Sequence, residues 1–308
     1  MNPNSSLSAD ELRQVSGSLK RAHMSDHLAT AVFYVVSGAF VLLLIAFTMY
    51  VVWGGIKAFR PEIFSFEANG IGNQFFNTVY LVFLSLVISV PIGIFAGVYM
   101  AEYAPEGRII HALRIAIETL SSLPSIVVGL FGYLVFIIMV GSQWNLFAGA
   151  LAVSVLSLPL ITATTYDALK ALPHGFKEGS LALGATHFET IWKVMLPAAI
   201  GPIVTGIILA AGRGFGEAAA LLYTAGMSTD ISWKVWDITS PVCPLNPFRP
   251  GETLSLQVWA SRTEGVGGSA ADTAAAASAV LMLMVLAFSI GARLISHYIT
   301  KKTEGEHA

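Results

Sequence analysis

Two charged residues, Arg213 and Glu217, interrupt a stretch of the chain that is otherwise small and apolar. A guanidinium group offers paired donors in one plane that match an oxyanion, so an arginine there could bind an anion. The spacing of four residues puts both side chains on one face of a helix, where they can form an ion pair. The pair could therefore line the route of an anion, with Glu217 tuning the strength of Arg213. It could equally be a neutralised lock between helices, and both interpretations stay open.

A second group of residues lies in a polar segment between two apolar ones, which reads DALKALPHGFKEGSLALGATHFETIWKVMLP. Its spaced residues are Glu178, Gly179, Ser180, Gly184, Leu196 and Pro197. The prolines and glycines predict two short helices at an angle, with Gly184 at the turn. Glu178 is expected in the first turn of one helix, where the helix dipole favours a carboxylate. It would either cap that helix or make a charged contact with another protein.

Motifs for metal or nucleophilic chemistry are absent from the sequence. It contains no HExxH zinc motif, no GxSxG nucleophile elbow and no GxxxxGK[ST] phosphate loop. His23 and His27 are four residues apart but have no third ligand, and Asp167 and His187 are expected at a solvated or protein-facing surface. A single cysteine, Cys243, excludes an internal disulfide. We therefore expect no catalytic residue, no metal, no cofactor and no ATP hydrolysis by this chain alone.

The composition places the elements that carry these residues in a membrane. Of the 308 residues, 55% are hydrophobic and 12% are charged, against about 25% charged in soluble domains. The net charge of −2 argues against a nucleic-acid partner. The first apolar stretch follows a polar tail and is longer than a signal-peptide core, so it predicts a true span.

Six stretches approach the ~20 apolar residues that cross hydrocarbon as a helix, namely 28–53, 75–100, 122–141, 146–166, 197–225 and 272–297. The sequence thus predicts an all-α membrane protein, with one transmembrane domain at 28–300 and tails at 1–27 and 301–308. Residues 107–120 alternate apolar and charged positions at helical spacing, which predicts an amphipathic helix at the inner face.

The distribution of positive charge predicts the orientation. If both termini are cytoplasmic, eleven Lys and Arg lie inside and five lie outside, which follows the positive-inside bias. The inside residues are Arg13, Lys20, Arg21, Arg108, Arg114, Lys170, Lys177, Lys193, Arg293, Lys301 and Lys302. The outside residues are Lys57, Arg60, Lys234, Arg249 and Arg262. The outside segment 226–271 is rich in proline and tryptophan, which favours an ordered loop at the mouth of the domain over a floppy connector.

The polar segment resembles the cytoplasmic EAA loop of ABC-importer permeases, which reads Glu-Ala-Ala, three residues, Gly, nine residues, an aliphatic, any residue, Leu-Pro. The spacing matches throughout, with Gly179 and Ser180 at the two alanine positions. Three further segments are similar to the permease pair of the phosphate ABC importer, and most to its PstA type: AEYAP at 101–105, LPSIVVGLF at 123–131, and RGFGE with the following ALLYTA at 213–225. The resemblance covers about residues 30–300.

That resemblance implies a type I ABC importer permease fold with six transmembrane helices and a place in the bacterial inner membrane. It implies that the loop 167–196 receives work from an ATPase through Glu178, Gly179, Ser180, Gly184, Leu196 and Pro197, and that Arg213 and Glu217 lie on the translocation pathway. The implied partners are a PstC-like sister permease, a PstB-like ATPase dimer, a PstS-like periplasmic phosphate-binding protein, phosphate and lipid.

Two alternatives remain at this stage. The chain could carry another oxyanion, because selectivity in such systems lies largely in the binding protein. It could instead be an intramembrane enzyme or a proton-coupled carrier that uses Arg213 and Glu217. An EAA-like loop favours the ATP-driven class, because neither an intramembrane enzyme nor a proton-coupled carrier needs a docking surface for an ATPase.

Overall fold

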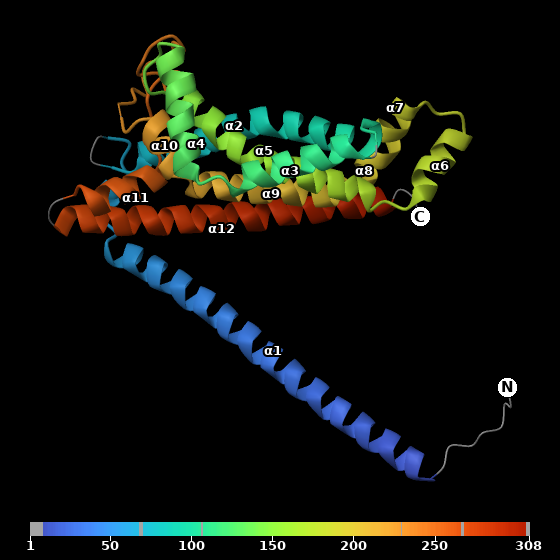
Figure 1. The fold of residues 1–308 in the computed structure, drawn as a ribbon. Coiled ribbons are helices and arrows are strands. Elements are labelled where there is room, and N and C mark those ends of the chain that lie inside the picture. The colour runs from blue at the N-terminus through green and yellow to red at the C-terminus, as the bar shows by residue number, and fades with distance from the viewer. Residues whose placement is uncertain (1–8, 68–69, 106, 229, 266–267, 306–308) are drawn as a thin grey trace. The chain divides into compact units, whose positions relative to one another are not determined.

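The computed structural model describes residues 9–67, 70–105, 107–228, 230–265 and 268–305, and every regular element in these ranges is a helix (Figure 1). The longer helices are α1 (Ala9–Lys57), α2 (Gly72–Val98), α3 (Arg108–Ser122), α5 (Leu146–Lys170), α9 (Ile200–Gly216), α11 (Leu254–Thr263) and α12 (Gly268–Gly305). The shorter ones are η1 (Pro61–Phe64), α4 (Ser125–Gly132), α6 (His174–Ala182), α7 (His187–Thr190), α8 (Leu196–Ala198) and α10 (Ala219–Thr224). Three π-helical segments extend neighbouring helices: η2 (Tyr99–Tyr103), η3 (Tyr133–Met139) and η4 (Ile191–Met195). The predicted all-α fold is confirmed.

The chain divides into two compact units, residues 1–51 and 52–308. The described part of the first unit is the helix α1 up to Val51, and its side chains from His23 onward are almost all exposed. Helix α1 already begins at Ala9, so the predicted polar tail is helical where it is described. Residues 1–8 and 306–308, the ends of the two predicted tails, lie outside the described residues.

Four straight helices are long and apolar enough to cross a membrane: His23–Lys57, Gly72–Tyr103, Leu146–Lys170 and Ala270–Ser296. Two bent pairs raise the number of candidate spans to six, in agreement with the prediction. The first pair joins α3 to α4 and η3 at 96°, and α3 is the predicted amphipathic helix. The second pair joins the segment His187–Ala198 to α9 at 69°.

The prediction of one continuous fifth span over 197–225 is wrong. Helix α9 ends at Gly216, Glu217 has an extended backbone (φ −71°, ψ 124°), and α10 starts a new helix at Ala219. Glycines at 212, 214 and 216 weaken the last turn of α9, because glycine loses more backbone entropy in a helix than other residues. The stretch is apolar and helical as predicted, but it forms two helices and not one.

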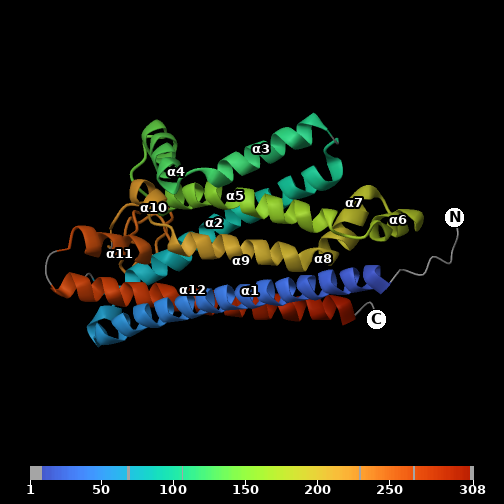
Figure 2. The ribbon, with the colours of Figure 1, turned by 60° about the horizontal axis from the view of Figure 1, so that its bottom comes forward.

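The second unit is built around α2 and α5, which pack along each other (Figure 2). Two glycines of α2 permit this approach: a Cβ at Gly93 would meet Ile161 of α5, and one at Gly97 would meet Thr165. Small residues allow such close backbone contact between membrane helices. Helix α9 packs against α5 on one side and against α12 on the other.

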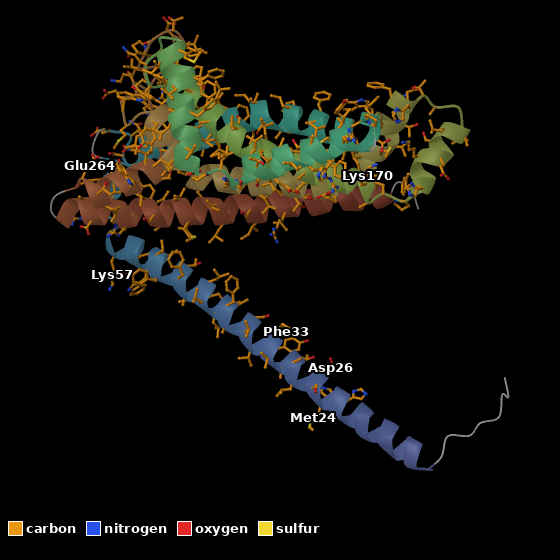
Figure 3. All side chains as sticks on the ribbon, viewed as in Figure 1. Met24, Asp26, Phe33, Lys57, Lys170 and Glu264 are labelled. Atoms are coloured by element: carbon orange, nitrogen blue, oxygen red, sulfur yellow. The ribbon has the colours of Figure 1, made fainter. Side chains whose placement is uncertain are left out.

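The polar parts of this unit gather at its two ends. Helices α6, α7 and α8 form one end, and α10 and α11 lie at the opposite end in both views (Figures 1 and 2). Figure 3 shows Lys170, the last residue of α5, at the α6 end, and Glu264, which follows α11, at the other. We call residues 171–198 the docking loop and residues 226–253 the outer loop, after the role and the side of the membrane that the sequence predicts for them.

Candidate functional site

The docking loop contains the predicted pair of short helices. Helix α6 follows Pro173, and the chain then turns at Gly184, whose φ of 88° lies in the left-handed region that favours glycine. Helix α7 begins with a capping box, in which the Thr186 hydroxyl accepts from the Glu189 amide and the Glu189 carboxylate accepts from the Thr186 amide. Gly184 thus occupies the turn that its spacing predicted.

The predicted position of Glu178 needs a correction. Helix α6 begins at His174, so Glu178 lies one turn inside the helix and not in its first turn. Its side chain is exposed, and no hydrogen bond or ion pair ties it to another side chain within the described part of the chain. A capping role is therefore excluded in this structure, and the carboxylate is free to meet another protein.

The tip of the docking loop exposes apolar side chains to an unusual degree. Leu183 is 91% exposed, Phe188 is 62% exposed and Leu181 is 41% exposed. Gly179 follows Glu178 and precedes these apolar residues in the sequence. No atom lies within 4 Å of the position that a Cβ of Gly179 would occupy. Exposed apolar side chains close together in the sequence and next to polar groups are typical of a protein-binding surface.

The base of the docking loop is anchored in the second unit. Ile191 and Met195 of η4 are buried with Val98 and Leu169 in one apolar cluster, against which Leu196 packs. Pro197 lies at the start of α8 and is exposed. The Ser180 and Thr190 hydroxyls are 2.9 Å apart and link α6 to the end of α7. The predicted loop residues thus divide into an exposed set and an anchoring set.

One residue of this site, Glu102, was not singled out by the sequence analysis except as part of a motif. Its carboxylate Oε2 lies 2.6 Å from Lys177 Nζ of α6 and 3.3 Å from His187 Nε2 of α7. His187 was expected at a solvated or protein-facing surface, and it is in fact half-buried against Glu102. A separation of 75 residues hides this contact from any local sequence pattern.

Arg213 and Glu217 are brought to the same region but do not form the predicted ion pair. Within the described residues, Arg213 has no carboxylate within ion-pair distance, and its Nη1 lies 3.4 Å from the Leu156 carbonyl oxygen. Glu217 is 8% exposed, and its Oε1 accepts a hydrogen bond of 3.0 Å from the Ala220 amide. The pairing prediction is wrong because it assumed an unbroken helix: the break after Gly216 turns Glu217 toward the start of α10.

Arg213 lies on an open face of α9. Its side chain is exposed, and a Cβ at Gly212 or Gly216 would meet nothing within 4 Å. Two turns earlier, α9 packs closely against α5, since a Cβ at Gly206 would overlap Thr164 of α5. The open part of α9 is therefore the last turn, around Arg213.

The break between α9 and α10 packs against α4. A Cβ at Gly129 would meet Ala220, and one at Gly132 would meet Thr224. Val128, Ala152, Leu156 and Ala220 form a shared buried cluster. Two sequence segments that carried the family resemblance, 123–131 and 213–225, therefore lie side by side.

The outer loop is ordered, as the prolines and aromatics predicted. Arg249 is 1% exposed and donates hydrogen bonds to the carbonyl oxygens of Cys243, Pro244 and Pro250 and to Asn77 Oδ1 of α2. Burial of this guanidinium lowers the pKa of Arg249 to about 10. Such a network fixes the loop on the end of α2, because each buried donor has an acceptor.

A buried carboxyl completes this network. Glu252 is 5% exposed, and its Oε2 accepts from Gln74 Nε2 at 3.0 Å. Its burial raises its pKa to about 7, and the hydrogen bond from Gln74 offsets part of that rise. Glu252 therefore changes its charge in the neutral range, where an exposed glutamate stays ionised.

No group of three or more His, Cys, Asp or Glu side chains that could hold a metal ion occurs among the described residues. The rings of His23 and His27 stack with centroids 6.2 Å apart.

Comparison with known proteins identifies a family that this chain matches. Residues 89–304 match the model of the family described as "Binding-protein-dependent transport system inner membrane component". The chain is 40% identical to the probable ABC transporter permease protein YqgI of Bacillus subtilis (strain 168) over 286 residues, which cover 91% of this chain and 97% of that relative. It is 32% identical to the phosphate transport system permease protein PstA of Xylella fastidiosa (strain 9a5c) over 232 residues, which cover 74% of this chain and 75% of that one.

Solved structures share the fold. A chain of the bacterial alginate ABC transporter, solved in complex with an alginate-bound periplasmic protein, superposes with a TM-score of 0.64 at 17% identity and covers 91% of this chain and 98% of its own. A chain of the MetNI methionine ABC transporter in an inward-facing conformation superposes with a TM-score of 0.55 at 17% identity. The match covers 79% of this chain and 100% of that one. The family match at residues 89–304 includes the docking loop and the helices that hold it.

Proposed function

The chain belongs to the family of binding-protein-dependent transport system inner membrane components, and on that premise we propose that it is a permease subunit of an ATP-driven importer of inorganic phosphate. Members of this family are multi-pass permease subunits of ABC transporters. The finer parts of the proposal are the substrate, the partners and the roles of individual residues.

The observation that carries the proposal is the docking loop. It presents Glu178 and an apolar tip around Leu183 at one end of the unit, and its base is packed onto the ends of α2, α5 and α9. An exposed carboxylate beside an apolar patch suits a groove with a basic residue and an apolar floor on an ATPase. ATP binding would close a PstB-like ATPase dimer and move this loop, and the helices anchored to it would move with it.

The choice of phosphate rests on the PstA relatives and on Arg213. The Xylella relative is described as a phosphate transport system permease protein. Arg213 presents an exposed guanidinium without a carboxylate partner in the described chain, on an open face of α9. A cation is costly within a membrane unless it faces protein or water, so an unpaired one marks a route for an anion. A PstC-like subunit would complete that route, and a PstS-like protein would deliver phosphate to it.

Glu217 takes a different role in this proposal from the one its spacing suggested. It would hold the start of α10 against α4 through the hydrogen bond to Ala220, and so keep the break next to Arg213 in place. An intramembrane enzyme or a proton-coupled carrier was an alternative built on an Arg213–Glu217 pair, and it loses its basis because that pair is not formed.

The test is transport by the assembled complex in liposomes, with the PstC-like permease, the PstB-like ATPase and the PstS-like binding protein of the same organism. Uptake of labelled phosphate that depends on ATP and on the binding protein is the expected result. Excess arsenate should compete, because it is a tetrahedral oxyanion of the same charge, and excess sulfate should not. Uptake of sulfate or molybdate in place of phosphate would show that the substrate is another oxyanion.

A further inference from the structure

Helices α6 and α7 of the docking loop both contact one carboxylate, that of Glu102 in η2, the segment that continues α2. Glu102 Oε2 lies 2.6 Å from Lys177 Nζ of α6 and 3.3 Å from His187 Nε2 of α7. Tyr103, the next residue, places its ring edge-on to the His187 ring, with centroids 5.1 Å apart. These contacts converge from elements that are separated by 75 and 85 residues in the sequence.

The Glu102 carboxylate is shielded from water, so its charge depends on these two partners for compensation. Its side chain is 6% exposed, whereas the side chains of Lys177 and His187 are 38% and 36% exposed. Removing one partner of a buried ion pair is costly, because it leaves a buried charge without compensation. By contrast, the other ion pair of this loop, between Lys193 and Glu189, has side chains 72% and 41% exposed and contributes little.

Few other contacts hold α6 to the unit. The helix is joined to α5 through residues 171–173, and the Ser180 hydroxyl bonds Thr190 of α7. None of the side chains of α6 is buried. The Lys177–Glu102 ion pair is therefore the main side-chain contact of α6 with a membrane helix in the described part of the chain.

Helix α2 is suited to pass on a displacement at Glu102. With η2 it forms one straight span from Gly72 to Tyr103, and it packs tightly along α5 through Gly93 and Gly97. Its far end is bonded to the outer loop: Asn77 Oδ1 accepts from Arg249 at 2.6 Å, and Gln74 donates to Glu252. One helix thus joins the docking loop to the outer loop.

We propose that Glu102 is a positioning residue that fixes both docking-loop helices to α2, so that movement of the loop is carried through α2 to the outer loop. This inference rests on the proposed role of the docking loop, and Glu102 itself touches neither the ATPase nor the transported ion. Neutralising it leaves the docking surface around Glu178 and Leu183 in place but loosens that surface from α2.

The experiment measures phosphate imported per ATP hydrolysed by the reconstituted complex. In Glu102→Gln, the ratio of import to ATP hydrolysis should fall about tenfold, a size typical of coupling free energies, while the ATPase still co-purifies. Glu102→Asp keeps the charge and should retain more of the ratio. Glu189→Gln is the matched control: it makes the same change at the exposed ion pair of the same loop, keeps the capping box, and should leave the ratio unchanged.

The outcomes separate this inference from the proposed function. A normal ratio in Glu102→Gln would overturn the role of Glu102, and so would a parallel fall in import and ATP hydrolysis, which indicates only a loss of folded complex. If Glu102→Gln has a normal ratio while Gly184→Val imports nothing, the docking loop stands and only the tie to α2 is wrong. If both variants import normally, the docking role fails as well. Should Glu102→Gln not assemble, the same ratio is measured on Lys177→Gln, where a partial fall is expected and a normal ratio is contrary.

Discussion

At the scale of single residues, the structure separates two charges that the sequence seemed to join. Arg213 remains exposed near the end of α9, and Glu217 is buried and holds the first turn of α10. In the proposed function, Arg213 would bind the anion through the paired donors of its guanidinium group, which lie in one plane.

The first prediction concerns Arg213. Arg213→Gln should lower phosphate uptake roughly tenfold to hundredfold, because a hydrogen bond to a charged group contributes about 1.5–3 kcal/mol. Arg213→Lys should keep part of the uptake, since ammonium retains the charge and loses the fork. Uptake is measured in reconstituted complexes of equal composition. Because Glu217 is not the partner of Arg213, the double variant Arg213→Gln/Glu217→Gln should be as impaired as the single one, and full recovery in it would support a structural lock instead.

The second prediction concerns Glu252 and pH. Its pKa is raised from 4.5 to about 7, so between these values the folded chain keeps a proton that the unfolded chain has released. The free energy of unfolding should therefore fall as pH rises from 4.5 to 7, by about 3 kcal/mol, and stay level outside that window. Denaturation of the complex in mixed micelles across pH 4–8 measures it. Glu252→Gln should remove the dependence, and an unchanged slope in that variant would contradict the assignment.

At the scale of elements, the docking loop combines a rigid turn with weak helices. Gly184 has a left-handed backbone (φ 88°), and nothing lies within 4 Å of its Cβ position. Substitution there acts through the backbone alone, since space is available. Gly179 lies inside α6 and has equal room around it, but its backbone is helical and not left-handed. A substitution at Gly179 therefore serves as a control for one at Gly184.

The third prediction is that Gly184→Val abolishes uptake while the protein still inserts into the membrane. A left-handed conformation costs an L-residue about 1–2 kcal/mol, and a β-branched side chain is restricted further. The loop would then relax to a different turn and present its tip at the wrong angle. Gly179→Ala should stabilise α6 by roughly 0.5–1 kcal/mol and leave uptake intact. Normal uptake by Gly184→Val, measured at equal membrane content, would show that the loop does not transmit work.

The sequence predicts these elements unevenly, and the reasons are physical. Apolar length identifies spans, because a helix must cover the hydrocarbon whatever its neighbours are. The turn at Gly184 was predictable because glycine at a left-handed turn is a local requirement. The 69° bend at Ala199, the break after Gly216 and the contact of Glu102 with Lys177 were not predicted, because tertiary packing decides them. The relation of Arg213 to Glu217 depends on such packing, so their spacing on one helix face was a poor guide to it.

At the scale of the whole molecule, the chain is a multi-pass protein of the inner membrane, and its second unit has two chemically different ends. The docking loop lies at one end and the outer loop at the other (Figures 1 and 2). More Lys and Arg fall in the segments expected inside than in those expected outside, which predicts that the docking loop faces the cytoplasm, the side that holds ATP. Two exposed side chains, one at each end, make this orientation measurable.

The fourth prediction is that Leu183→Cys reacts with a membrane-impermeant thiol reagent only from the cytoplasmic side, and Phe248→Cys only from outside. Leu183 and Phe248 are 91% and 67% exposed, whereas the single native cysteine, Cys243, is 1% exposed and gives a low background. Labelling is compared in intact cells and in inverted vesicles, and wild-type chain in both preparations measures the background. A tag after Ala308 should be reachable only in inverted vesicles, because six spans return the chain to the side from which it started. Labelling of both cysteines from one side, or a tag accessible opposite to Leu183→Cys, would break the six-span arrangement, and the docking loop could then not meet an ATPase.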